Sequence, residues 1–193
     1  LTAVGGPGSS SGLWDWIFSV APAGCGTVNP SLIPPGTQTT VTTTFTAGST
    51  PGPCTVTVTL KMASGRIASR SQTTLIAAGT IVINKTAVGG NDTFSYTSTI
   101  PGNATFNITT TGGSGSQTFA GVTAGSYTVT ESAPPSGWDF TSLSCVDPDN
   151  GTTVSGQTAT IDLDPGETVT CTYTNTRRGT IVINKTAVGG NDT

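Results

Sequence analysis

The sequence predicts an all-β protein built from β-sandwich domains. Thr is its most abundant residue, with 41 Thr and 19 Ser among 193 residues. Thr, Val and Ile favour strands because branched side chains fit a pleated surface. Only 9% of the residues are charged, whereas helical proteins are rich in Glu, Lys and Arg. Short alternating runs separated by Gly, Pro and Ser clusters recur along the chain, a pattern typical of a sandwich.

Residues 1–78 contain four strand-like runs, and clusters such as Pro34-Pro35-Gly36 mark the turns between them. Trp14 and Trp16 share a face of the first run, so we expect both in the core. The four runs are Leu13–Val20, Thr37–Phe45, Thr55–Met62 and Ala68–Ile76.

An exact internal copy organises the rest of the chain. Gly79–Thr93 reads GTIVINKTAVGGNDT and recurs at Gly179–Thr193, at an offset of 100 residues. Self-similarity at a fixed offset marks an array, so the copy predicts a unit over residues 79–178. Residues 179–193 are then the first strand of a further unit. Because a lone strand cannot bury its apolar face, this segment is expected to be disordered, to continue into a further unit, or to be a donor strand to a neighbouring subunit.

The predicted unit contains eight runs with strand character and no amphipathic helix of useful length. Turns fall at Gly- and Pro-bearing clusters between the runs. The runs are Thr80–Lys85, Thr93–Ser98, Ala104–Thr109, Gln117–Phe119, Gly125–Glu131, Trp138–Cys145, Thr158–Leu163 and Thr168–Asn175.

Three of these runs end in a polar residue on an otherwise apolar face. Residues two apart in a strand share a face, so Lys85 follows Ile81 and Ile83. Glu131 and Asn175 end two other such faces. An unpaired buried Lys or Glu is costly, so three such residues call for a joint explanation.

The unit resembles the Cna-B-type (prealbumin-like) repeat of bacterial surface adhesins and pilins. The resemblance covers Gly79–Arg178. It rests on the opening strand ending in Lys85, the Gly-x-Tyr-x-Val-x-Glu run over Gly125–Glu131, and the closing strand ending in Asn175. In that family the Lys and Asn can join in an intramolecular isopeptide bond, assisted by the Glu. The resemblance therefore implies Lys85 as the nucleophile, Asn175 as the acceptor and Glu131 as the proton shuttle.

Residues 1–78 lack this triad and resemble a generic immunoglobulin-like module. The predicted fold is therefore all-β, with tandem immunoglobulin-like/prealbumin-like β-sandwich domains. Three alternatives for the polar residues stay open. Lys85 and Glu131 could form a satisfied ion pair, Lys85 could extend outward to solvent, or Val82 could face inward in place of Ile83.

Four cysteines, none in a C-x-x-C pair, indicate two disulfides and an oxidising environment. The domain division favours Cys25–Cys54 and Cys145–Cys171 among the three possible pairings. Each would close a loop of roughly 30 residues and contribute about 3–4 kcal/mol in the chain-entropy model. The alternative is four free buried thiols.

Acidic residues form two smaller candidate sites. Asp147, Asp149 and Asn150 share one loop, where spaced acids could bind Ca²⁺, but the twelve-residue ligand pattern is missing and a solvated turn is the favoured interpretation. Asp162 and Asp164 share a face and could serve glycoside chemistry, although acids before a Pro-Gly turn are more typical of an exposed edge. We therefore predict no metal and no cofactor.

Glycosylation sequons fall in turns at Asn91, Asn103 and Asn150, which are the accessible candidates in an exported protein. Trp138 is the best candidate for an exposed aromatic platform that would bind carbohydrate.

The composition disfavours several classes of function. The chain has no His, the commonest general base, and its net charge of −3 offers no basic patch for nucleic acid. No apolar run approaches the ~20 residues of a membrane helix.

We predict a non-enzymatic, extracellular structural protein of a cell-surface stalk, filament, pilus-like fibre or adhesin. Its partners would be copies of itself or further repeats, and host or surface glycans. The alternative is an adhesive or carbohydrate-binding module of a secreted protein.

Overall fold

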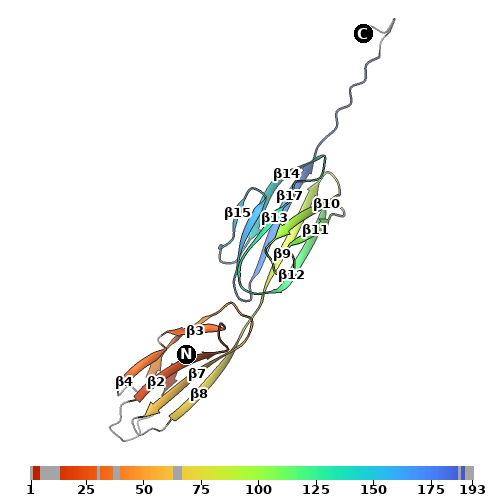
Figure 1. The fold of residues 1–193 in the computed structure, drawn as a ribbon. Coiled ribbons are helices and arrows are strands. Elements are labelled where there is room, and N and C mark those ends of the chain that lie inside the picture. The colour runs from red at the N-terminus through yellow and green to blue at the C-terminus, as the bar shows by residue number, and fades with distance from the viewer. Residues whose placement is uncertain are drawn as a thin grey trace.

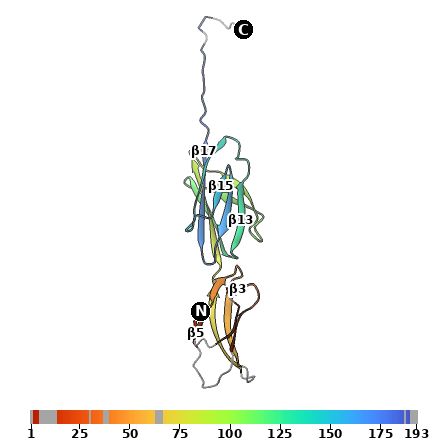
Figure 2. The same cartoon turned by 90° about the vertical axis from the view of Figure 1, so that its left-hand side faces the viewer.

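The fold is all-β, as the composition predicts. A computed structural model describes residues 2–4, 14–29, 31–36, 40–62, 67–186 and 188–189. Every regular element within these ranges is a strand. The described residues contain no helix that could cross a membrane. Figures 1 and 2 show the strands up to β8 and the strands from β9 onward in separate parts of the molecule. No sheet within the described residues contains strands from both groups.

The first group forms a four-stranded sheet of order β4-β2-β7-β8 and two pairs, β3-β6 and β1-β5. Its strands are β1 (Thr2–Val4), β2 (Trp14–Ala21), β3 (Gly26–Asn29), β4 (Leu32–Gly36), β5 (Thr40–Thr42), β6 (Thr44–Ala47), β7 (Gly52–Met62) and β8 (Ile67–Ile76).

The expected alternation is clearest in β7, whose residues Val56, Val58 and Leu60 face the core. Trp16 is buried with them, as predicted. The side chain of Trp14 and residue 13 lie outside the described part of the chain.

Two predictions in this region were wrong. Pro34-Pro35-Gly36 was predicted as a turn but lies in β4. This strand is at the edge of its sheet, where Pro is tolerated because one row of backbone groups needs no ladder partner. The single strand predicted over 37–45 is two strands, β5 and β6, separated at Thr43 and paired with different partners. Residues 37–39 of that prediction lie outside the described ranges.

The second group forms two sheets, of order β11-β10-β13-β16-β15 and β12-β9-β17-β14. All eight predicted runs are strands, and β15 was missed because it is only three residues long. The strands are β9 (Gly79–Val88), β10 (Thr93–Ser98), β11 (Thr105–Thr109), β12 (Ser114–Val122), β13 (Gly125–Glu131), β14 (Trp138–Val146), β15 (Thr153–Ser155), β16 (Thr158–Leu163) and β17 (Thr168–Arg177).

The two sheets enclose one apolar core, to which alternate residues of each strand contribute. In β9, residues Ile81 and Ile83 are fully buried and Val82 is only half-buried. The predicted orientation is therefore confirmed, and the alternative with Val82 inward is wrong. β9 lies between β12 and β17 and runs parallel to β17, so the opening and closing strands of the unit are direct neighbours.

The repeated sequence provides a matched test of this core. We expect Ile81→Ala to lower the free energy of unfolding of the β9–β17 sandwich by about 2–5 kcal/mol, because it leaves a cavity in a buried site. Ile181→Ala changes the same residue in the identical sequence context, but Ile181 is 88% exposed. It should change the free energy of unfolding by less than about 0.5 kcal/mol. Denaturant unfolding of both variants would measure the difference, and equal effects would contradict the placement of β9.

Candidate functional site

Three strands of the second group bring one polar residue each to a common point in the core. Lys85 comes from β9, Asn175 from the neighbouring β17, and Glu131 from β13 in the facing sheet. In the parallel pair, Lys85 is in register with Tyr173, so the lysine lies one inward-facing position from Asn175 on the adjacent strand. All three polar side chains are buried, with exposures of 1% for Lys85, 1% for Glu131 and 0% for Asn175.

The three side chains form a closed hydrogen-bonded triangle. Lys85 Nζ donates to Glu131 Oε1 at 2.8 Å and to Oε2 at 2.9 Å, and to Asn175 Oδ1 at 2.6 Å. Asn175 Nδ2 donates to Glu131 Oε1 at 2.6 Å. Each member therefore contacts both others. We call this set the Lys–Glu–Asn triangle.

Three aromatic residues lie next to the triangle, Phe94 against the Lys85 amine, Tyr96 in register with Glu131 and Tyr173 in register with Lys85. The ring centroid of Phe94 lies 4.1 Å from Lys85 Nζ, a cation–π contact. Tyr96 and Tyr173 are buried beside it with their ring centroids 5.2 Å apart in an edge-to-face arrangement. Sequence reasoning missed Phe94 and Tyr96 as neighbours of the site, although their alternation in β10 could have placed them on its inward face.

Close approach of the two sheets beside the lysine requires a residue without a side chain. Gly115 of β12 is in register with Lys85. A Cβ at Gly115 would lie 2.7 Å from Ile108 Cγ2 and 2.8 Å from the Thr109 carbonyl oxygen. Glycine thus lets β11 approach β12 closely at the position beside Lys85.

Burial lowers the pKa of Lys85 below its ordinary value of 10.5, and the hydrogen bond and charge of Glu131 oppose that shift. Lys85 does not extend outward to solvent, because it is 1% exposed. The contact with Glu131 is an ion pair with a nitrogen–oxygen distance of 2.8 Å. The amine also lies within hydrogen-bond distance of the Asn175 amide, so the geometry suits proton transfer to the carboxylate and attack on that amide.

Disulfides join Cys25 to Cys54 and Cys145 to Cys171. All four cysteines lie in the described ranges and none is free. Cys145 and Cys171 face each other directly on β14 and β17. Each bond stays within one of the two groups of strands.

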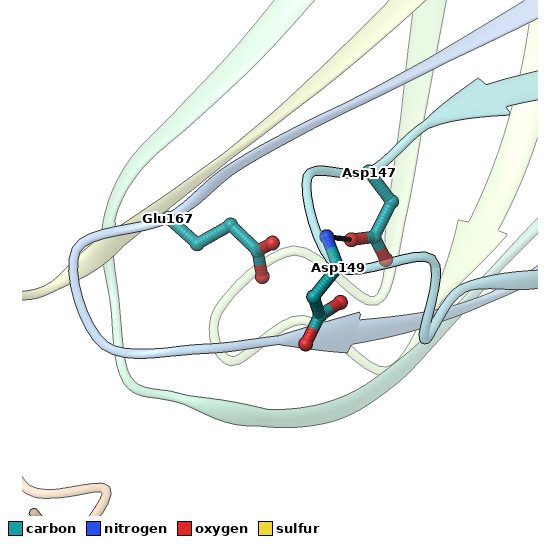
Figure 3. A group of neighbouring side chains, drawn as sticks. All are labelled: Asp147, Asp149 and Glu167. Atoms are coloured by element: carbon teal, nitrogen blue, oxygen red, sulfur yellow. Dashed lines mark hydrogen bonds between the residues drawn. The ribbon is translucent and has the colours of Figure 1, made fainter.

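The acidic loop gathers more carboxylates than its sequence suggested. One ligand atom from each of Asp147, Asp149 and Glu167 lies within 4.8 Å of the others, and Figure 3 shows Glu167 reaching the loop from the turn before β17. The loop uses these groups for its own backbone: Asp147 accepts from the Asp149 amide at 3.1 Å and from the Thr152 amide at 2.7 Å. Asn150 completes the turn with a positive φ of 66°.

The pKa values in this loop move in opposite directions. A hydrogen bond with the Thr152 side chain, and then those from the Thr152 and Asp149 amides, lower the pKa of Asp147 against an opposing effect of desolvation. Desolvation and then neighbouring carboxylates raise the pKa of Asp164 and that of Glu167. The hydrogen bonds suit the solvated turn that the sequence favours, in which the backbone amides take the place of a cation.

The structure contradicts the carbohydrate platform. Trp138 is 5% exposed, packs edge-on against Phe94 at 5.3 Å, and donates from Nε1 to Asp92 Oδ2 at 2.9 Å. Its partner Asp92 lies 46 residues away in sequence, so no local signal indicated the burial. Trp138 is a core residue.

The glycosylation candidates differ in exposure. Asn91 and Asn150 are exposed and Asn103 is half-buried. The Asn91 side-chain oxygen accepts from the Gly113 amide at 2.8 Å, and the Asn103 side-chain nitrogen donates to the Pro101 carbonyl at 3.1 Å. Use of the three sequons stays a prediction.

A sequence profile described as a prealbumin-like fold domain matches residues 81–177. The chain belongs to this family. The match spans β9 to β17 and confirms the resemblance drawn from the sequence. We refer to the strands from β9 to β17 as the prealbumin-like unit.

Several solved structures are similar to the chain. The major pilin from Streptococcus pyogenes is 12% identical, with a TM-score of 0.42, and the match covers 87% of this chain and 92% of the pilin. GBS52, the minor pilin of Streptococcus agalactiae, is 11% identical, with a TM-score of 0.35 and coverage of 91% and 87%. The Bacillus anthracis TIE protein is 13% identical, with a TM-score of 0.38, and the match covers 86% of this chain but only 34% of that one. A comparison with curated proteins gives no match.

The acidic loop of the prealbumin-like unit generates a pH prediction. A carboxylate whose pKa is lowered by folding stabilises the folded state above its unfolded pKa, and that contribution is lost as the pH falls through the folded pKa. Asp147→Asn leaves one acceptor oxygen for two backbone amides and cannot ionise. We expect it to lower the unfolding midpoint at pH 7, with the difference from wild type shrinking below the ordinary pKa of 3.8. Denaturant unfolding across pH would show this, and a difference independent of pH would contradict it.

Proposed function

We propose that the chain is a structural, extracellular protein of a surface stalk, filament, pilus-like fibre or adhesin. In this proposal an isopeptide bond between Lys85 and Asn175 locks the prealbumin-like unit. The observation that carries the proposal is the buried Lys–Glu–Asn triangle, in which the amine, the amide and a carboxylate lie in mutual hydrogen-bond contact.

The geometry supports formation of the isopeptide bond within the triangle, with loss of ammonia. The Lys85 ammonium passes a proton to Glu131, and the neutral amine attacks Cγ of Asn175. The Cγ–Nζ bond forms. Glu131 lies 2.6 Å from Asn175 Nδ2 and protonates this nitrogen as the Cγ–Nδ2 bond breaks. Glu131 then accepts and keeps the second proton from Nζ, and the nitrogen of Asn175 leaves as neutral ammonia.

Burial favours the product. A buried ion pair costs desolvation energy for both charges, whereas the product is a neutral amide beside a carboxyl group. The reaction consumes its own side chains, so it occurs once per molecule and makes the unit a self-linking domain and not an enzyme.

Several features support an exposed, load-bearing role outside the cell. Two disulfides are typical of an oxidising compartment. The low charge and the short turns suit a rigid, protease-resistant surface protein. Burial of Trp138 removes the observation on which a carbohydrate-binding module rested, so the structural role is favoured.

The domain division is part of this proposal. We assign residues 1–78 to an immunoglobulin-like sandwich, 79–178 to the prealbumin-like unit, and 179–193 to the first strand of a further unit or to a strand donated to a neighbouring subunit. The separation of the sheets between β8 and β9 and the confinement of each disulfide to one side of it support this division. In this proposal the partners of the protein are copies of the chain or further repeats.

The mass of the intact protein tests the proposal. We expect the mass of the folded wild-type chain, with its disulfides reduced, to lie below the sequence mass by one ammonia. Lys85→Met and Asn175→Ala should each show their full sequence mass, because each removes one end of the bond. Glu131→Gln should also show its full sequence mass. Gln keeps the shape of the side chain but cannot shuttle the proton, so the bond does not form.

A control variant keeps the measurement specific. Lys185→Met changes the corresponding lysine in the repeated sequence at residues 179–193. Its mass should still lie below its sequence mass by one ammonia. A wild-type chain with its full sequence mass would overturn the proposed bond.

A further inference from the structure

The molecule shows one sequence in two environments. Residues 79–88 form β9 inside the prealbumin-like unit, where Ile81 and Ile83 are 0% exposed. Residues 179–186 have the same sequence but no strand partner among the described residues, and Ile181 and Ile183 are each 88% exposed. Figures 1 and 2 show this segment projecting from the end of β17, away from the sheets.

The β9 position between β12 and β17 is a site that this sequence fits. It offers strand pairing on both sides, pockets for two isoleucines, and the acceptor pair of Glu131 and Asn175 for the lysine. A segment 179–186 in this position would place Lys185 where Lys85 now lies. Since the two sequences are identical, the segment would pack and pair there as residues 79–86 do now.

The segment cannot occupy the β9 position of its own unit. β9 and β17 are parallel, and Thr80 pairs with Thr168 at the start of β17. Thr180 would have to reach Thr168, but the chain leaves β17 at Arg177, roughly 30 Å away at about 3.3 Å per residue. The three residues from Arg177 to Thr180 span at most about 10 Å. A receiving site must therefore belong to a unit other than its own.

We propose that Lys185 is a second isopeptide nucleophile, whose acceptor is Asn175 in a second copy of this chain. The proposal rests on the isopeptide chemistry proposed above. Lys185 Nζ forms a bond with Cγ of the second copy's Asn175, the Cγ–Nδ2 bond breaks, and ammonia leaves. Glu131 of that copy takes the first proton from Nζ and passes it to Nδ2, then accepts and keeps the second. The donor segment and the acceptor site are different parts of the molecule, so the contact is head-to-tail and joins copies into open chains or rings.

The state of Lys85 controls this reaction. Once Lys85 is joined to Asn175 of its own unit, the β9 position is closed and the acceptor is consumed. The residues 79–88 are tethered to their site at an effective concentration on the order of millimolar, so the internal bond forms first in dilute solution. Linkage between copies is then limited to units that meet before closure, during folding.

A lysine variant isolates the linkage between copies. Lys85→Met keeps a long, apolar side chain in β9 but leaves Asn175 unused. Refolded at increasing protein concentration, the full Lys85→Met chain should form covalent dimers and longer species that survive denaturation and reduction of the disulfides. Lys85→Met/Lys185→Met and Lys85→Met/Asn175→Ala, refolded in parallel, should stay monomeric. Mass spectrometry of the digested dimer should place the link between Lys185 and Asn175.

The outcomes separate this proposal from the previous one. A folded Lys85→Met chain that stays monomeric, beside a wild-type chain that has lost one ammonia, overturns the linkage between copies alone. A wild-type chain with its full mass overturns both. If Lys85→Met does not fold, wild-type chain is refolded instead. The fraction of chains linked to another copy should rise in proportion to protein concentration. It should be about 1% at about 10 μM, because the chain's own β9 competes at an effective concentration on the order of millimolar. No linked product at about 1 mM would overturn the proposal.

Discussion

A lysine ammonium enclosed in an apolar sandwich is the constraint on which the prealbumin-like unit depends. Removing one charge from water costs several kcal/mol, and only partners with good geometry offset that cost. Those partners come from both sheets: Glu131 from β13 and Asn175 from β17. The two sheets must therefore face each other in one register, and Gly115 allows the close approach beside Lys85 that this register needs.

The disulfide and the triangle connect different pairs of strands. Cys145 and Cys171 tie β14 to β17, whereas the triangle connects β17 to β9 and, through Glu131, to the facing sheet. The disulfide and the proposed isopeptide bond are thus complementary and not redundant. β17 is common to both, since Cys171 and Asn175 lie on the same inward face four residues apart.

The alternation of residues along strands explains which parts of the fold could be predicted from the sequence. Lys85, Glu131 and Asn175 each end an apolar face, and a face is a local property that survives folding. Trp138 and Glu167 behaved differently. Trp138 bonds to Asp92, and Glu167 lies near Asp147 and Asp149. These partners are distant in sequence, and no local pattern encodes such contacts. Strand β15 is too short for an alternation of buried and exposed residues to be visible in its sequence. The prolines of β4 are compatible with a strand because that strand is at the edge of its sheet.

The parallel pairing of β9 and β17 has a mechanical consequence. The chain enters the unit at Gly79 and leaves it at Arg177, at opposite ends of two adjacent parallel strands. Tension along the polypeptide therefore pulls these strands past each other in shear, so the hydrogen bonds of the ladder share the load at once and do not open one by one. A link from Lys85 to Asn175 would carry that load directly from strand to strand, and the remaining seven strands of the sandwich would lie outside the path of the force.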